Sequence, residues 1–118
     1  MEPIFSNRMK DVLTFSRQEA IRLGHDYIGV EHFLLGMICD AEGIAVKILK
    51  TLSVDIHKLK TAIERAIRTD QKKVVIEMNK IPMVKQAEKI LRHTVLEAKK
   101  FKSSKVEAEH LLLAILND

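Results

Sequence analysis

Cysteine, proline, glycine and aromatic residues are all scarce in this chain of 118 residues. Cys39 is the only cysteine, so no disulfide can form within the chain, which is typical of a reducing compartment. With 2 prolines, 4 glycines and 4% aromatics, the composition favours helix over sheet. No apolar run approaches the roughly 20 residues of a membrane-spanning helix, and no secretory signal pattern opens the chain. These absences predict a soluble, cytoplasmic, all-α protein of one domain, with no membrane partner.

Positive charge is in modest excess, at a net +4. Lysines gather at 72–73 and again between 99 and 105. Acidic residues are interspersed throughout, and few aromatics stand among the lysines. This pattern favours a solvated basic face, because nucleic-acid-binding modules usually carry a motif as well. Nucleic acid is therefore an unlikely partner in this interpretation. A basic helical nucleic-acid-binding module remains the alternative function.

A repeat offset by 78 residues organises the chain. "VEHFLLGMICD" at 30–40 reappears as "AEHLLLAILND" at 108–118. Before each copy, apolar and small residues recur in steps of three and four, from Phe5 to Leu23 and from Met83 to Phe101, which predicts one long helix per copy. Each "EH" segment is apolar on nearly all sides, which predicts a short helix at the centre of a bundle. Gly36 and its counterpart should let neighbouring helices approach closely.

Two further helices are predicted after the first copy, over 43–52 and 54–67. Asp55 is expected as an N-cap and Gly24 as the C-terminal stop of the first long helix. Repeat one then spans 5–68, a linker 69–82, and a partial repeat two 83–118, truncated after its second helix. The missing helices should leave apolar surface uncovered. Pro82 is expected at the entrance of the second long helix, and Cys39 is expected to be buried.

The Glu-His pairs at 31–32 and 109–110 carry no recognisable catalytic motif. Zinc-protease spacing fails, because no His-Glu dipeptide exists and Ile28 stands where the inverted motif needs histidine. The glycines at 24 and 29 have P-loop spacing, but Val30 and Glu31 follow in place of Lys and Ser/Thr. Two interpretations stay open. Glutamate at a helix start is favoured by the macrodipole, and the histidine can bond a neighbouring loop; alternatively, the repeated pair is functional, since the loops before it have diverged.

The stretch "RLGHDYIGVEHFLLGMICDAEGIAVKILKTL", residues 22–52, closely resembles the N-terminal domain of the ClpC/ClpA family of AAA+ unfoldases. The resemblance implies two tandem four-helix Clp repeats in a pseudo-twofold arrangement. It implies a domain that sits above the ATPase ring of a homohexamer and receives adaptor and substrate proteins. The ring unfolds them and passes them to a ClpP-type peptidase. ATP would bind in modules outside this chain, so the fragment should be no enzyme and hold no cofactor or metal.

The resemblance also implies phosphoarginine recognition, in which the acidic residues Glu31 and Glu109 contact the tagged side chain. The neighbouring Val30, His32, Ala108 and His110 complete the two sites. Val30 and Ala108 replace a family threonine, so a hydroxyl near the phosphate is missing from both. Glu107 replaces the glycine of the first copy and adds negative charge. We therefore expect adaptor or degron docking in preference to phosphoarginine, and a better first site than second.

Overall fold

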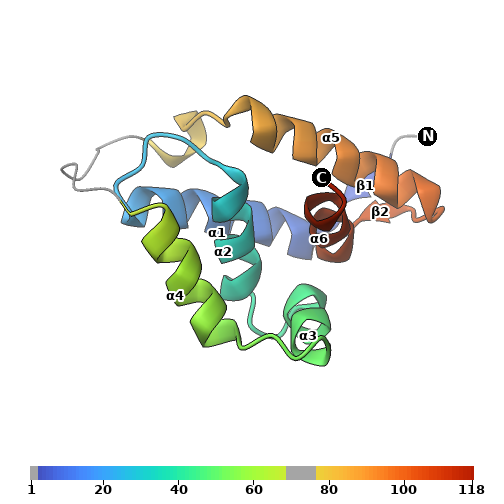
Figure 1. Cartoon of the computed structure of the whole chain (residues 1–118). Helices are drawn as coiled ribbons and strands as arrows, with labels where there is room; N and C mark the ends of the chain where they lie inside the picture. Colours follow the sequence, from blue (N-terminus) through green and yellow to red (C-terminus); the bar gives the residue numbers. More distant parts are fainter. Residues whose placement is uncertain (1–2, 69–76) are drawn as a thin grey trace.

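The computed structural model describes residues 3–68 and 77–118, and these form a helical bundle (Figure 1). The all-α class is confirmed. The elements follow the order β1 (Ile4–Phe5), α1 (Asn7–Arg22), α2 (Val30–Cys39), α3 (Ile44–Thr51), α4 (Ile56–Ala66), the 3₁₀ helix η1 (Met78–Lys80), α5 (Lys85–Lys100), β2 (Lys105–Val106) and α6 (Ala108–Leu116).

The two long helices end in the same way. After α1, the Gly24 N–H donates to the Ile21 carbonyl and the His25 N–H to the Ala20 carbonyl, with Gly24 at φ 79°. This is the Schellman arrangement, and it confirms Gly24 as the stop. After α5, Lys102 takes the equivalent position at φ 55°, a left-handed conformation that glycine adopts with less strain. The repeat therefore preserves the turn without preserving its glycine.

Helix α2 occupies the centre of the bundle, as its apolar pattern predicts. It packs against α1, α3, α4, α5 and α6. Gly36 is where α1 and α2 come closest, because a Cβ atom there would lie 2.6 Å from the Val12 carbonyl oxygen and would also strike the Ser16 hydroxyl. That hydroxyl donates to the Val12 carbonyl at 2.8 Å, so it needs no partner on α2. The prediction of a close approach at Gly36 is confirmed.

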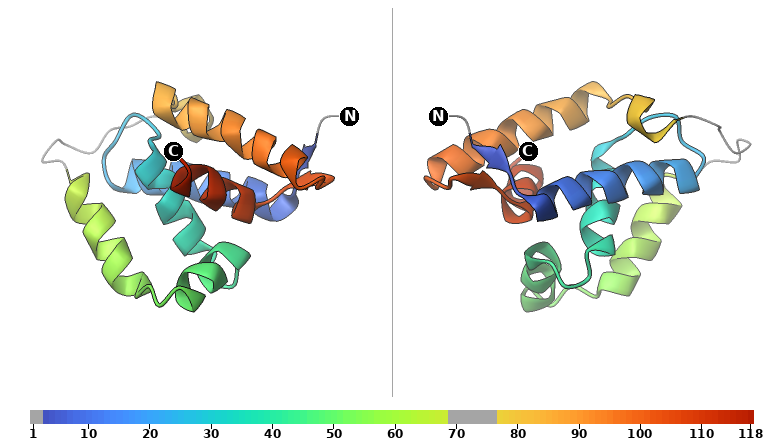
Figure 2. Two further views of the ribbon diagram at one scale, coloured as in Figure 1. Left: turned by 45° about the vertical axis from the view of Figure 1, so that its right-hand side comes forward. Right: turned by 180° about the vertical axis from the view of Figure 1, so that it is seen from behind.

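In each repeat, the extended segment before the long helix forms β-type pairing with the segment before the short central helix of the other repeat (Figure 2). Strands β1 and β2 are parallel, with Phe5 opposite Val106. A parallel bridge joins Met83 to Ile28, and these two positions are the same pair shifted by 78 residues. The exchange is a mark of the expected pseudo-twofold arrangement. It also corrects the predicted helix starts, because Phe5 and Met83 lie in extended backbone before α1 and α5.

Several other expectations can be compared with the structure. Asp55 is confirmed as the N-cap of α4, accepting from the Lys58 N–H at 3.1 Å. The expectation for Cys39 was wrong, because it is exposed at the last residue of α2, where the central helix leaves the core. Pro82 lies just outside α5, where its carbonyl accepts from the Ile28 N–H. Most of the predicted linker, 69–76, lies outside the described residues, and the repeat boundaries stay a prediction.

Some apolar side chains of repeat two lie uncovered. Phe101 and Leu116 are each 60% exposed, while their counterparts Leu23 and Ile38 in repeat one are partly buried. Helix α4 lies beside Leu23 in repeat one, as the lining of their common cleft shows. Among the described residues, no helix is long and apolar enough to span a membrane.

Candidate functional site

Both Glu-His motifs begin a central helix. Glu31 is the second residue of α2 and Glu109 the second residue of α6. Each carboxylate is partly exposed, and within residues 3–68 and 77–118 neither makes an ion pair or a hydrogen bond. The positive end of each helix dipole favours a negative charge at this position. Both carboxylates therefore lack a partner among the described side chains and are available to bind another molecule.

The histidines of the motifs are structural. His32 Nδ1 accepts a hydrogen bond from the Gly29 N–H at 2.8 Å, and His110 Nδ1 accepts from the Glu107 N–H at 2.9 Å. Gly29 and Glu107 are the N-caps, so each ring does what Glu or Gln does at the third position of a capping box. Both rings are buried. The interpretation that they bond neighbouring backbone is confirmed, and it explains why histidine stands at the third position of both helices.

Repeat one adds a second histidine to this arrangement. His25 Nδ1 lies 2.8 Å from His32 Nε2, and Tyr27 packs against both rings. Because His32 Nδ1 is an acceptor, its proton is on Nε2 and is donated to His25. His25 then carries its own proton on Nε2, which is buried with no partner among the described residues. Burial and the neighbouring His25 lower the pKa of His32 to about 4, so His32 is neutral near pH 7.

Each motif glutamate lines an open pocket. The pocket beside Glu31 measures about 550 Å³ and is formed by the loop after α1 and the end of α4. The pocket beside Glu109 measures about 240 Å³ and includes residues of α1 and α3. The first is lined by His25, Asp26, Tyr27, Glu31, Ala66, Ile67 and Arg68. The second is lined by Arg8, Glu42, Ile44, Lys47, Glu107, Ala108 and Glu109.

The remaining predicted site residues take different places. Ala108 is buried yet lines the second pocket, whereas Val30 is half-buried and lies outside the lining of the first. His32 and His110 support the helix starts from within the core. The structure thus brings Glu109 and Ala108 into one pocket and leaves Val30 as a packing residue beside Glu31.

Three cationic residues in these pockets were missed by sequence reasoning. Arg8 and Lys47 line the pocket of Glu109, and Arg68 lines that of Glu31. Arg8 forms a two-pronged ion pair with Asp40, at 2.9 and 3.2 Å. The strand exchange between repeats places β1 and the first turn of α1 beside the start of α6. Arg8 and Glu109 are about a hundred residues apart in the sequence, so only the symmetry of the repeat could have indicated that they line the same pocket.

No metal centre accompanies the sites. Across the described ranges 3–68 and 77–118, no group of three or more His, Cys, Asp and Glu side chains could hold a metal ion.

Comparison with known families gives one matching model, the Clp repeat (R) N-terminal domain, over residues 4–118. Similar proteins include the chaperone protein ClpB of Oceanobacillus iheyensis, 35% identical over 97% of this chain. The negative regulator of genetic competence ClpC/MecB of Bacillus subtilis is 36% identical over 97% of the chain. The chloroplastic ClpC2 chaperone of Arabidopsis thaliana is 32% identical over the same share. The chain spans 14%, 14% and 12% of these three relatives.

Solved structures have the same fold. One, from a study described as preliminary structural investigations of a malarial protein secretion system, superposes with a TM-score of 0.80 at 27% identity, covering 97% of this chain and 77% of the other. The N-terminal domain of ClpD from Arabidopsis thaliana gives a TM-score of 0.72 at 21% identity, covering 93% and 73%.

Proposed function

The chain belongs to the Clp repeat N-terminal domain family, and from this premise we propose that it is the adaptor- and substrate-docking domain of a ClpC-like ATP-dependent unfoldase. The domain itself is not catalytic. The proposal includes the whole protein: a homohexamer, cytoplasmic, whose ATP-binding modules lie outside this chain and which delivers unfolded proteins to a ClpP-type peptidase. Its support is similarity to Clp chaperones, of which this chain spans 14% or less.

One observation carries the docking role. Glu31 and Glu109 occupy equivalent positions in the two repeats, each lines a pocket, and neither carboxylate has a partner among the described residues. A buried histidine holds each helix start through the N-cap N–H, so both carboxylates stand on rigid supports. Preorganised carboxylates suit the guanidinium group, which forms paired charge-assisted hydrogen bonds with them.

The ligand we propose for these carboxylates is an arginine side chain of a client or adaptor, with phosphoarginine as the specific form. A phosphorylated arginine carries both a guanidinium and an anionic group. Near Glu109, Lys47 supplies a cation for the anionic group, and near Glu31 Arg68 does so; Arg8 also lines the pocket of Glu109 but is paired with Asp40. Two such sites on one domain would increase the avidity for clients tagged more than once.

Calorimetric titration with a phosphoarginine peptide tests the proposal, with unmodified arginine and phosphoserine peptides as comparisons. We expect binding that prefers phosphoarginine, weakens in Glu31→Ala or Glu109→Ala, and disappears in the double variant. Glu88→Ala is the matched control, because Glu88 is an exposed acidic residue in the first turn of α5. Undiminished binding to a folded double variant would refute the assignment of these carboxylates.

A further inference from the structure

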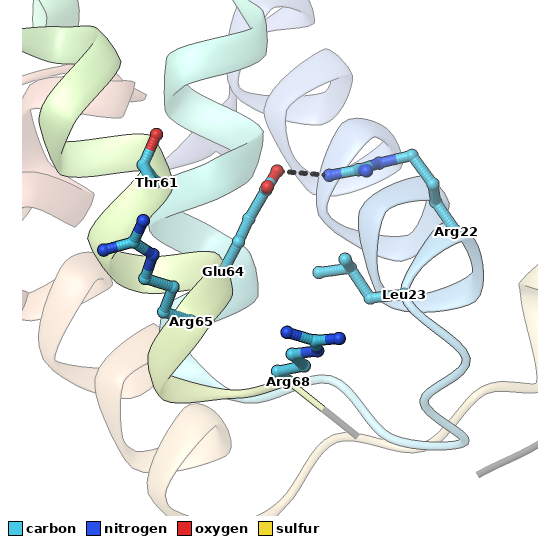
Figure 3. Close-up of a pocket in the computed structure, with 6 residues that line it drawn as sticks. All are labelled: Arg22, Leu23, Thr61, Glu64, Arg65 and Arg68. Carbon is cyan, nitrogen blue, oxygen red and sulfur yellow. Dashed lines mark hydrogen bonds and ion pairs between the residues drawn. The ribbon is translucent and has the colours of Figure 1, made fainter. Parts of the chain in front are cut away.

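A cleft of about 450 Å³ lies between the C-terminal end of α1 and the last turns of α4 (Figure 3). Its lining is Arg22, Leu23, Thr61, Glu64, Arg65 and Arg68. Three arginines and one glutamate give this small surface an excess of positive charge. Its size falls within the usual range for ligand sites, which is about 300–1,000 Å³.

One of the three arginines is fully engaged within the protein. Arg22 Nε donates to Glu19 at 2.6 Å, and one terminal nitrogen donates to Glu64 across the cleft at 2.6 Å. Figure 3 shows this second contact joining α1 to α4. Arg22 therefore ties the two walls together and shares its single positive charge between Glu64, in the lining, and Glu19.

The other two arginines are left without partners. Arg65 and Arg68 are exposed, and within the described parts of the chain neither makes an ion pair or hydrogen bond. Arg68 points toward Leu23 from the end of α4 (Figure 3). A guanidinium presents a planar fork of donors that fits a carboxylate. The partly buried Leu23 adds an apolar surface, and the Thr61 hydroxyl, which donates to the His57 carbonyl, keeps its oxygen as an acceptor.

Helix α4 extends the basic surface. It carries Lys58, Lys60 and Arg65 against a single acidic residue, Glu64, which is paired with Arg22. Ile63 of this helix is buried and Ile56 and Leu59 pack against the core, whereas Lys58 and Arg65 are exposed, so the outer face of the helix can be covered by a partner.

We propose that this cleft is a second docking surface, which binds an acidic segment of a partner protein. Carboxylates of the segment pair with Arg65 and Arg68, while an apolar side chain contacts Leu23. Charge complementarity selects the partner, and the absence of aromatic side chains from the lining favours a peptide over stacked nucleic-acid bases. Its charge is opposite to that of Glu31 and Glu109, so the two kinds of site accept different groups. Arg68 lines both this cleft and the pocket of Glu31, so the two surfaces are continuous.

Fluorescence anisotropy at about 0.1 M salt, where the Debye length is about 10 Å, tests the surface with a short labelled peptide of glutamate, glycine and leucine. The same peptide with glutamine in place of glutamate is the uncharged comparison. We expect only the acidic peptide to bind, and to bind about tenfold more weakly, or worse, after Arg65→Gln and Arg68→Gln together. Both side chains are exposed, so the fold should persist, and circular dichroism checks it.

The control removes the same charge elsewhere. Lys10→Gln with Lys50→Gln, on exposed positions of α1 and α3, should leave binding within about twofold of the wild type, because exposed charges more than a Debye length away are screened. Equal loss in both double variants would mean non-specific attraction and would overturn the proposal. Tighter binding of an oligothymidylate through Arg65 and Arg68 would overturn it in favour of a nucleic-acid surface. Glu31→Ala with Glu109→Ala should not weaken binding of the acidic peptide, whereas it should abolish phosphoarginine binding, which separates this test from that of the proposed function.

Discussion

The buried His32 ring makes the stability of the domain depend on pH. Near neutrality His32 accepts from the Gly29 N–H and donates to His25, so its ring is used in the neutral form. A proton added to His32 Nδ1 would break the bond that caps α2. Acid should therefore destabilise the start of the helix that carries Glu31.

The size of the effect follows from the pKa of His32, which folding lowers from 6.5 to about 4. A histidine with a depressed pKa in the folded state favours the fold when it is neutral. This stabilisation is fully present above about pH 6.5 and is lost as the pH falls toward 4. Between about pH 7.5 and 5 the loss from this one group is about 2 kcal/mol, before most carboxylates titrate.

Urea unfolding followed by circular dichroism, repeated across this pH range, measures the loss. His32→Gln is the informative variant, because glutamine at this position can still accept from the Gly29 N–H but does not titrate. It should be less stable than the wild type near pH 7.5 and should lose about 2 kcal/mol less on acidification. His57→Gln, at an exposed position on α4, is the matched control. Parallel pH profiles for the wild type and His32→Gln would refute the reasoning.

Three further outcomes follow from particular contacts. Gly36→Ala should destabilise the domain by about 1–3 kcal/mol in urea unfolding, because the new methyl meets the Val12 carbonyl and Ser16 hydroxyl; a cost below a few tenths would mean that α1 and α2 separate freely. Lys102→Gly should stabilise by up to about 1 kcal/mol in thermal unfolding, since the left-handed backbone strain is removed; a lower melting temperature would contradict this. Ser6→Ala should cost about 1 kcal/mol by loss of the N-cap bond to the Met9 N–H, again by urea unfolding, and an unchanged midpoint would show that the cap contributes nothing.

The sequence predicts the helices and the central place of α2 because apolar periodicity records burial directly. The roles of Gly24 and Asp55 could also be predicted, because only a few residue types favour a left-handed turn or an N-cap position. The pairing of β1 with β2 could not be predicted from the sequence, because a strand of two residues is too short to show a periodic pattern. Cys39 was misplaced because a pattern that is apolar all round does not show where the helix leaves the core.

Some residues of the candidate site could likewise be predicted from the sequence, and others could not. Glu31 and Glu109 are visible in the sequence because the repeat sets them at matching positions. Arg8, Lys47 and Arg68 are not, because they reach the pockets from other elements through tertiary packing. Neither the partner-free state of the two carboxylates nor the basic cleft beside α4 has a signature in local sequence.

The most direct test of the docking role is a two-dimensional NMR titration of the ¹⁵N-labelled domain with a phosphoarginine peptide. The account expects saturable shifts at the starts of α2 and α6, around Glu31 and Glu109, which disappear when the two residues are replaced by alanine in a folded domain. Shifts confined to other surfaces, or an unchanged spectrum at saturating peptide, would contradict it and leave the Glu-His pairs with a purely structural role.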